Sequence, residues 1–192
     1  AKHPTIKKDG LRVTAKEDLP IIKDALFNYI GKGLASDLKA VNLNVKQLRE
    51  EQFLIIQADY LDYHQYGSVG KNIQVNVSAI QKYLNQNMIP VISSIGSHQD
   101  DDLININADH LATAIAIAMK AQKLILMTDV QGVIEHGTLI KRLNISDVQS
   151  KIDNRIITGG MIPKVESAVA TIKAGVNEVI IGNNLLTGTI IE

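Results

Sequence analysis

The sequence predicts an α/β fold, a three-layer α/β/α sandwich in which helices cover both faces of a mainly parallel central sheet. Continuous apolar segments, such as 88–95 and 124–128, have the length and character of strands that are buried on both faces. Segments with apolar residues at helical spacing alternate with these strands along the chain. This alternation is typical of parallel sheets.

The first expected helix follows Thr14 and Glu17, which have the spacing of a capping box. Its apolar face is marked at helical spacing by Leu19, Ile22, Leu26 and Tyr29. The pattern therefore predicts a helix that begins just after Thr14.

The remaining elements follow from the same kinds of pattern. Residues 66–76 alternate and are punctuated by glycines, which predicts a hairpin arm, and 133–143 predicts a second hairpin broken at His136-Gly137. A polar loop is expected at 96–102. Strands are expected at 44–48, 53–57, 88–95, 103–105, 124–128, 178–182 and 189–191, and helices at 78–87, 108–121, 146–152 and 161–174.

Composition excludes several classes of protein. The chain has 192 residues, 45% hydrophobic and 21% charged, which suits one globular domain. Its 20 basic residues balance its 20 acidic residues, so no global field attracts nucleic acid or a membrane surface. The absence of cysteine excludes disulfides and thiol catalysis, and the histidines lack metal-ligand spacing, so no metal site is expected. With no signal peptide or membrane-length apolar run, we expect a soluble cytoplasmic protein.

Residues 158–166, Thr-Gly-Gly-Met-Ile-Pro-Lys-Val-Glu, are the most informative stretch. Gly159 and Gly160 precede a helical pattern, and Lys164 falls in its opening turns, where the helix dipole disfavours a cation. An anion held by free backbone N–H groups would offset that conflict. The segment indicates a phosphate site with a lysine directed at it. A glycine turn, a helix started by Pro163 and a solvated lysine explain the same residues about equally well.

Polar residues also stand at two expected strand ends, where ligands of parallel sheets bind. In Asn105-Ile-Asn-Ala-Asp109, Asn107 can cap the following helix and Asp109 suits its dipole. The same side chains can instead hold polar substrate groups and orient a lysine. Thr128-Asp129 follows the most apolar strand and can bind a ribose or phosphate, or simply form a turn.

Arg12 lies just before the first expected helix. Its guanidinium fork suits a carboxylate or a phosphate, although an exposed arginine near a helix start is the commoner situation.

Taken together and in this order, these motifs resemble the amino-acid kinase family. The resemblance extends from residue 10 to the strand near 191, and the short ending at 182–189 is similar to the form found in lactic-acid bacteria. The matching segments are Gly-Leu-Arg-Val-Thr (10–14), Tyr-Gly-Ser-Val-Gly (66–70), Asn-Ile-Asn-Ala-Asp (105–109), Leu-Met-Thr-Asp-Val-Gln-Gly-Val (126–133) and Gly-Gly-Met-Ile-Pro-Lys-Val-Glu (159–166).

The resemblance implies a homodimeric enzyme of arginine biosynthesis that phosphorylates the side-chain carboxylate of N-acetyl-L-glutamate with ATP and Mg²⁺. Lys164 would stabilise the transferring phosphoryl group, and Asp109 would organise the catalytic lysines. The substrate would be bound by Arg12, Asn105 and Asn107. The nucleotide would be bound by Thr128, Asp129, Val130, Gln131, Gly132, Val133, Ile134, Ile156, Ile157, Thr158, Gly159 and Gly160.

Two features depart from the family pattern. Family members begin with a strand carrying Lys-x-Gly-Gly and a later strand ending in His-Gly-Gly-Gly, and neither is present. We therefore expect residues 1–192 to form a single, N-terminally incomplete domain, in which 1–105 mainly bind the substrate and 106–192 mainly bind the nucleotide. Gln-Leu-Arg-Glu at 47–50 also replaces a glycine-rich segment of the relatives.

Two other kinds of function stay open on the sequence. One is a kinase of the same family that acts on carbamate, aspartate, glutamate or UMP, although 10–14 together with 105–109 favour N-acetyl-L-glutamate. The other is a noncatalytic module that binds a nucleotide or an acyl amino acid, which follows if Ala1 is the true start of the protein.

Overall fold

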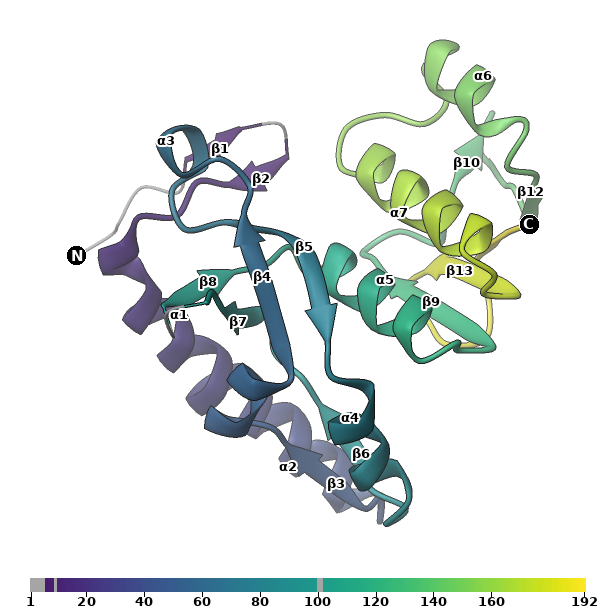
Figure 1. Cartoon of the computed structure of the whole chain (residues 1–192). Helices are drawn as coiled ribbons and strands as arrows, with labels where there is room; N and C mark the ends of the chain where they lie inside the picture. The colour runs from purple at the N-terminus through teal and green to yellow at the C-terminus, as the bar shows by residue number, and fades with distance from the viewer. Residues whose placement is uncertain (1–5, 9, 100–101) are drawn as a thin grey trace. The chain divides into compact units, whose positions relative to one another are not determined.

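The computed structural model describes residues 6–8, 10–99 and 102–192, and backbone contacts divide the chain into two compact units (Figure 1). The first unit is Ala1–Leu111 and the second is Ala112–Glu192. The expected loop at 96–102 includes residues 100 and 101, which lie outside the described residues.

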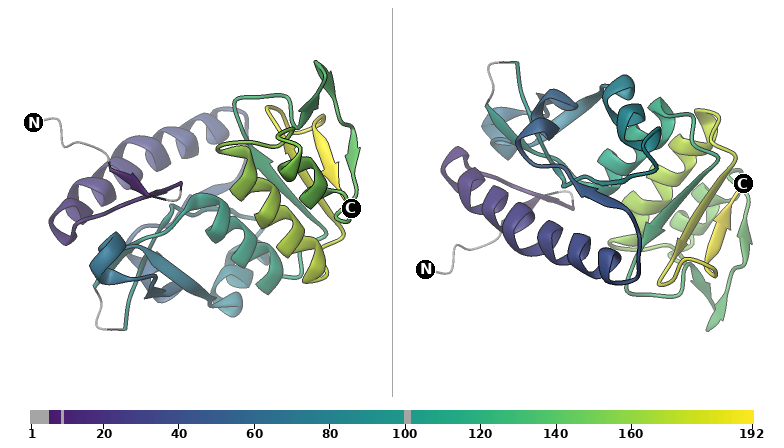
Figure 2. Two further views of the ribbon diagram at one scale, coloured as in Figure 1. Left: turned by 90° about the horizontal axis from the view of Figure 1, so that it is seen from above. Right: turned by 90° about the horizontal axis from the view of Figure 1, so that it is seen from below.

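The first unit begins with a short antiparallel hairpin, β1 (Lys7–Lys8) and β2 (Leu11–Arg12), followed by a long helix. The long helix is unbroken through four parts (Figures 1 and 2). These are the 3₁₀ turn η1 (Lys16–Asp18), α1 (Leu19–Asp24), the π-helical η2 (Ala25–Gly31) and α2 (Lys32–Ala40).

The capping box expected at Thr14 is wrong. Neither η1 nor α1 has a side-chain cap, and the Thr14 hydroxyl instead donates to the Arg12 carbonyl over 3.1 Å. The expected apolar face is also shifted within η2, because a π turn adds a residue to each turn of the helix. Phe27 is buried there, whereas Tyr29 is exposed.

The rest of the first unit combines two small sheets with short helices. Strand β3 (Val45–Gln47) pairs in parallel with β6 (Ile89–Val91). The second sheet has the order β5-β4-β7-β8, with β4 parallel to β7 and the outer pairs antiparallel. Its strands are β4 (Ile56–Tyr60), β5 (Gly70–Val75), β7 (Ile95–Ser97) and β8 (Leu103–Asn105), and the helices are η3 (Glu50–Leu54), α3 (Tyr63–Tyr66) and α4 (Val77–Leu84).

The single strand expected at 88–95 is two strands, β6 and β7. The fully buried Gln52 lies at the break, where its Nε2 donates to the Ser93 carbonyl over 2.7 Å and its Oε1 accepts from the Ser93 N–H over 2.9 Å. The side chain of Gln52 thus satisfies the backbone groups of Ser93 that a neighbouring strand would otherwise bond. The chain can therefore leave the sheet of β6 at Ser93 and enter the sheet of β7. The strand expected at 53–57 begins only at Ile56, since η3 occupies the residues before it.

The second unit contains one four-stranded sheet of order β12-β14-β13-β9 and a small hairpin. Strands β9 (Lys123–Met127) and β13 (Glu178–Gly182) are parallel, as are β12 (Arg142–Leu143) and β14 (Thr189–Ile191), while β13 and β14 are antiparallel. The hairpin pairs β10 (Ile134–Glu135) with β11 (Thr138–Leu139). The helices are α5 (Ala108–Ala118), whose first residues belong to the first unit, α6 (Val148–Asp153) and α7 (Met161–Lys173).

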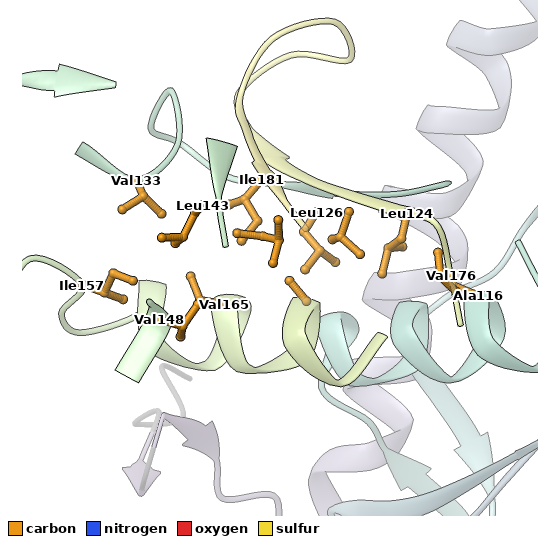
Figure 3. Packing of buried hydrophobic residues seen from close by; sticks show 13 residues of the cluster. Ala116, Leu124, Leu126, Val133, Leu143, Val148, Ile157, Val165, Val176 and Ile181 are labelled. Atoms are coloured by element: carbon orange, nitrogen blue, oxygen red, sulfur yellow. The ribbon is translucent and has the colours of Figure 1, made fainter. Parts of the chain in front are cut away.

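The core of the second unit lies between one face of this sheet and its helices (Figure 3). Leu124 and Leu126 of β9, Ile181 of β13 and Val165 of α7 all belong to this core, and all four are buried. Burial of each such side chain stabilises the fold by about 1.5–3 kcal/mol. This packing fixes the rotation of α7 about its axis and the position of the strand ends next to it.

The α/β class predicted from the sequence is confirmed. Both four-stranded sheets nevertheless mix parallel and antiparallel pairs. In the second unit the antiparallel pair is β13 and β14, which are joined by a short turn rather than by a helix. No helix in the described ranges has the length and apolar character needed to span a bilayer.

Candidate functional site

A cavity of about 190 Å³ lies beside the β1–β2 hairpin in the first unit. It gathers two cations and two amides, and of the described residues no Asp or Glu lines it. The three substrate-binding residues expected from the sequence, Arg12, Asn105 and Asn107, all face this one cavity. Its full lining is Lys7, Gly10, Leu11, Arg12, Val69, Asn105, Ile106 and Asn107.

Backbone hydrogen bonds to residues 66–68 hold the hairpin that carries Arg12. The Thr14 N–H donates to the Tyr66 carbonyl over 3.0 Å, and the Ser68 N–H donates to the Thr14 carbonyl over 2.7 Å. Gly67 between them has φ of 67°, and a Cβ there would lie 2.1 Å from the Thr14 carbonyl oxygen. Glycine is therefore required at 67 for its conformation and for the close approach.

Asn105, at the end of β8, is tied to the same hairpin. Its N–H donates to the Ser68 carbonyl over 2.9 Å, and its Nδ2 donates to the Thr14 hydroxyl over 2.9 Å. The hydroxyl donates in turn to the Arg12 carbonyl. This chain of hydrogen bonds holds the backbone of Arg12 next to the side chain of Asn105.

Asn107 caps α5, as the sequence predicts. Its Oδ1 accepts from the Asp109 N–H over 2.9 Å and from the His110 N–H over 3.1 Å. Because the oxygen is engaged, the group that Asn107 can offer to a ligand is its NH₂. The cap also fixes Asp109, half-buried, in the first turn of the helix.

A charged pair lies at the start of the long helix. Lys16 Nζ is 2.8 Å from Asp102 Oδ2. The hydrogen bond from Lys16 lowers the pKa of the Asp102 carboxyl, and the same bond raises the pKa of Lys16. The pair therefore keeps both charges at neutral pH and links residue 16 to the segment just before β8.

In the second unit, the loop after β9 is held by the β13–β14 turn. The Thr128 N–H donates to the Gly182 carbonyl over 2.9 Å, and the Thr128 hydroxyl donates to Asp129 Oδ1 over 3.1 Å. Gly132 is buried against Thr189, where a Cβ would lie 2.6 Å from the hydroxyl oxygen. This leaves the residues between 128 and 132, namely Asp129, Val130 and Gln131, exposed at the strand end.

Val133 and Ile157, both expected in the nucleotide pocket, are core residues with only 1% exposure. The Val133 N–H donates to the Thr189 hydroxyl over 2.8 Å, and the Ile157 N–H donates to the Lys151 carbonyl over 3.1 Å. Their side chains belong to the core, and their N–H groups are engaged within the chain.

Two glycines open the α7 helix. Gly159 has φ of 55°, and Gly160 is the N-cap without a side-chain cap. Within the described residues, neither glycine N–H donates a backbone hydrogen bond, and a Cβ at either position would meet nothing within 4 Å. Lys164 is half-buried in the opening turns, and the fully buried Val165 next to it sets the rotation of the helix. An open, uncapped N-terminus of this kind suits an anion.

The structure thus groups the predicted residues within each unit. Arg12, Asn105, Asn107 and Asp109 belong to the first unit, and the expected nucleotide loops and Lys164 belong to the second. The sequence did not indicate Lys7, which lines the cavity of the first unit. Lys7 is the cross-strand partner of Arg12 in the β1–β2 hairpin, and this pairing could indicate a role for Lys7 only once the register of the hairpin is known.

No cluster of three or more His, Asp or Glu residues in the described ranges is arranged to hold a metal ion. The basic cavity of one unit and the glycine-opened helix of the other are features of an α/β protein that handles small anionic molecules.

Comparison with known proteins identifies the family. The amino acid kinase family matches residues 2–183, so this chain belongs to the amino acid kinase family. It is 49% identical over 190 residues to an acetylglutamate kinase of Staphylococcus epidermidis, covering 99% of this chain and 78% of that protein. It is 46% identical over 188 residues to an acetylglutamate kinase of Streptococcus mutans, covering 98% of this chain and 77% of that protein.

A crystal structure of a protein from Streptococcus mutans UA159 superposes on the fold with a TM-score of 0.94 at 45% identity. The match covers 99% of this chain and 78% of that one. The family resemblance drawn from the five sequence motifs is therefore confirmed.

Proposed function

We propose that this protein is an acetylglutamate kinase, which transfers the γ-phosphoryl group of ATP to the side-chain carboxylate of N-acetyl-L-glutamate in arginine biosynthesis. The observation that carries the proposal is the cavity in which Arg12, Asn105 and Asn107 meet, within a chain 49% identical to a relative of that name. The substrate is an anion with an amide group, and the cavity offers cations and amides to it.

The first unit binds the acyl amino acid in this proposal. The Arg12 guanidinium pairs with the α-carboxylate, since a planar fork and a carboxylate form strong charge-assisted hydrogen bonds. Asn105 and the NH₂ group of Asn107 bind the remaining polar groups, and Asp109 organises the catalytic lysines. The hydrogen bonds through Thr14 support this assignment, because they hold the backbone of Arg12 beside Asn105 before substrate arrives.

The second unit binds the nucleotide, with the loops at 128–134 and 156–160 around it. The N–H groups of Gly159 and Gly160 approach the phosphates, and Lys164 stabilises the phosphoryl group as charge spreads over its oxygens. Mg²⁺ neutralises phosphate charge when it is bound. Since Mg²⁺ is commonly held by substrate phosphates with only one or two carboxylates, it arrives with ATP and requires no cluster of protein ligands.

The direct test is a hydroxamate assay, which traps an acyl phosphate, on the intact protein with MgATP and N-acetyl-L-glutamate. We expect product with this acid and little with carbamate, aspartate or glutamate. Product with one of those acids but not with N-acetyl-L-glutamate would reject the substrate assignment. Nucleotide binding in a calorimeter without turnover of any acid would instead favour a noncatalytic binding module.

The proposed enzyme is a homodimer. Tyr29, Ile30 and Leu34 are large apolar residues that are exposed on the long helix of the first unit. Water-exposed apolar side chains grouped on one helix are typical of a protein interface. This helix is therefore the proposed contact between the two copies.

A further inference from the structure

The β1–β2 hairpin places two cations opposite each other. Lys7 and Arg12 are direct cross-strand partners, so their side chains lie on the same face of the hairpin, and both line the cavity. Like charges in this position destabilise a hairpin. Neither residue forms an ion pair with any of the described residues. Among the described residues, the repulsion between them therefore has no counter-charge in an ion pair.

The neighbouring lysine serves a different purpose. Lys8 pairs with Leu11, which puts it on the opposite face of the two-stranded ribbon. Its Nζ donates to Gln65 Oε1 and lies 5.0 Å from the centroid of the Tyr66 ring. Lys8 therefore makes an exposed surface contact with α3, whereas the backbone hydrogen bonds of Thr14 hold the hairpin in place. Lys7 faces the cavity without such a contact.

We propose that Lys7 is a second substrate-binding cation, whose ammonium group shares the α-carboxylate of N-acetyl-L-glutamate with the Arg12 guanidinium. The identity of the substrate rests on the proposed function, whereas the paired cations and the cavity rest on geometry alone. One carboxylate between the two cations converts their repulsion into two attractions. The side-chain carboxylate has to face the phosphoryl donor, so the α-carboxylate is the anion that remains for this pair.

Specificity follows from this arrangement. A substrate without the α-carboxylate leaves both cations facing an empty cavity, so it gains nothing from Lys7. The pair of cations thus favours N-acylated amino acids that have two carboxylates over N-acylated acids of similar length that lack the α-carboxylate.

The test compares Lys7→Met with Lys8→Met, which removes the same charge one residue away on the other face. Loss of a charge-assisted contact should raise the KM for N-acetyl-L-glutamate by about 5- to 30-fold in Lys7→Met. The KM for ATP and kcat should stay within about twofold, since the nucleotide site is untouched. Lys7→Arg should recover most of the loss, and Lys8→Met should leave the KM for the acyl amino acid within about twofold.

Two further measurements separate substrate binding from a structural role. Calorimetric Kd values for N-acetyl-L-glutamate should rise in parallel with KM, and the melting temperature of unliganded Lys7→Met should not fall, because a repulsion has been removed. With 4-acetamidobutyrate, which lacks the α-carboxylate, wild type and Lys7→Met should have equal activity.

Wild-type turnover of N-acetyl-L-glutamate tests the proposed function by itself. A wild type that uses this substrate, together with a Lys7→Met variant indistinguishable from Lys8→Met in KM and Kd, would overturn the role of Lys7 alone. A Lys7→Met defect of equal size on 4-acetamidobutyrate would also overturn it.

Discussion

Individual residues of the candidate site contribute in two ways, through a side chain or through the space that a missing side chain leaves. Arg12 and Lys164 belong to the first kind, because in the proposed function their charge meets a substrate group of opposite sign. Gly67 and Gly159 belong to the second, since both have positive φ. The surroundings of these two glycines differ, however, because only Gly67 packs against backbone.

Lys164→Ala should lower kcat by about 100- to 1,000-fold, as expected for loss of a charge that stabilises the transition state. The KM values for both substrates should change little, since the lysine acts mainly on the transferring phosphoryl group. Steady-state kinetics would check this, with Lys173→Ala at the other end of α7 as the control for loss of a charge from the same helix. Weakened substrate affinity with unchanged turnover would contradict the assigned role.

Gly67→Ala should detach the hairpin that carries Arg12. A Cβ at 67 would lie 2.1 Å from the Thr14 carbonyl, so the backbone has to move, and strain of about 1–3 kcal/mol arises from φ alone. We expect a lower melting temperature and a raised KM for the acyl amino acid, with the KM for ATP unchanged. Gly137→Ala is the matched control, because its φ of 77° is similar but its Cβ would meet nothing within 4 Å. Equal effects of the two variants would refute the steric argument.

At the scale of elements, the sequence predicts best where local pattern and tertiary packing agree. The strands at 178–182 and 189–191 have the predicted bounds, and α7 ends within one residue of its prediction. Errors fall where a distant side chain intervenes. Gln52 divides one expected strand into two by bonding to Ser93, and no local pattern reveals a partner 41 residues away.

The π turn in the long helix is a second such case. Gln47, from β3, donates to the Phe27 carbonyl within η2 over 2.7 Å. A π turn leaves the usual backbone bonding of the helix, and a side chain from another element satisfies the carbonyl. Gln47 therefore has a structural role in this chain, because it satisfies a carbonyl within the π-helical segment in which Phe27 is buried.

The candidate site, like the secondary structure, could be predicted from the sequence in part. The sequence named Arg12, Asn105 and Asn107, and the structure places all three around one cavity, although their contacts with substrate stay a prediction. The sequence did not predict a role for Lys7, because that role depends on Lys7 being paired with Arg12 across the hairpin. Strands of two residues are too short to show a periodic pattern from which this register could be predicted.

Two glycines of the long helix should respond oppositely to alanine. At Gly31, a Cβ would lie 2.5 Å from Gln47 Nε2 and 2.9 Å from the Leu26 carbonyl, so Gly31→Ala should destabilise the π turn. At Gly33 a Cβ would meet nothing within 4 Å, so Gly33→Ala should stabilise the protein by about 0.4–1 kcal/mol through higher helix propensity. Denaturant unfolding of both variants measures the difference. Equal shifts in the unfolding midpoint would contradict the close packing at Gly31.

For the whole molecule, the proposed dimer depends on the set of apolar residues exposed on the long helix. Tyr29 is 72% exposed, Ile30 62% and Leu34 48%. Ile30 and Leu34 are four residues apart, so they lie on one face of the helix. Leu185 and Leu186, exposed to 65% and 90%, are consecutive residues of the β13–β14 turn in the other unit. A helix face built from several such residues has the character of an interface, whereas two consecutive leucines at a turn form no such face.

The double variant Ile30→Asp/Leu34→Asp should therefore separate the proposed dimer into monomers, because two carboxylates in an apolar contact lose hydration without gaining partners. Sedimentation equilibrium should give twice the mass of one chain for wild type and a single chain for the variant at the same concentration. The melting temperature of wild type should rise with protein concentration, and that of the variant should not, since association stabilises only the folded state. Leu186→Asp, which adds a carboxylate at an exposed leucine outside the helix, should remain dimeric. A wild type that is monomeric at every concentration would reject the dimer, and a double variant that stays dimeric would reject this helix as its contact.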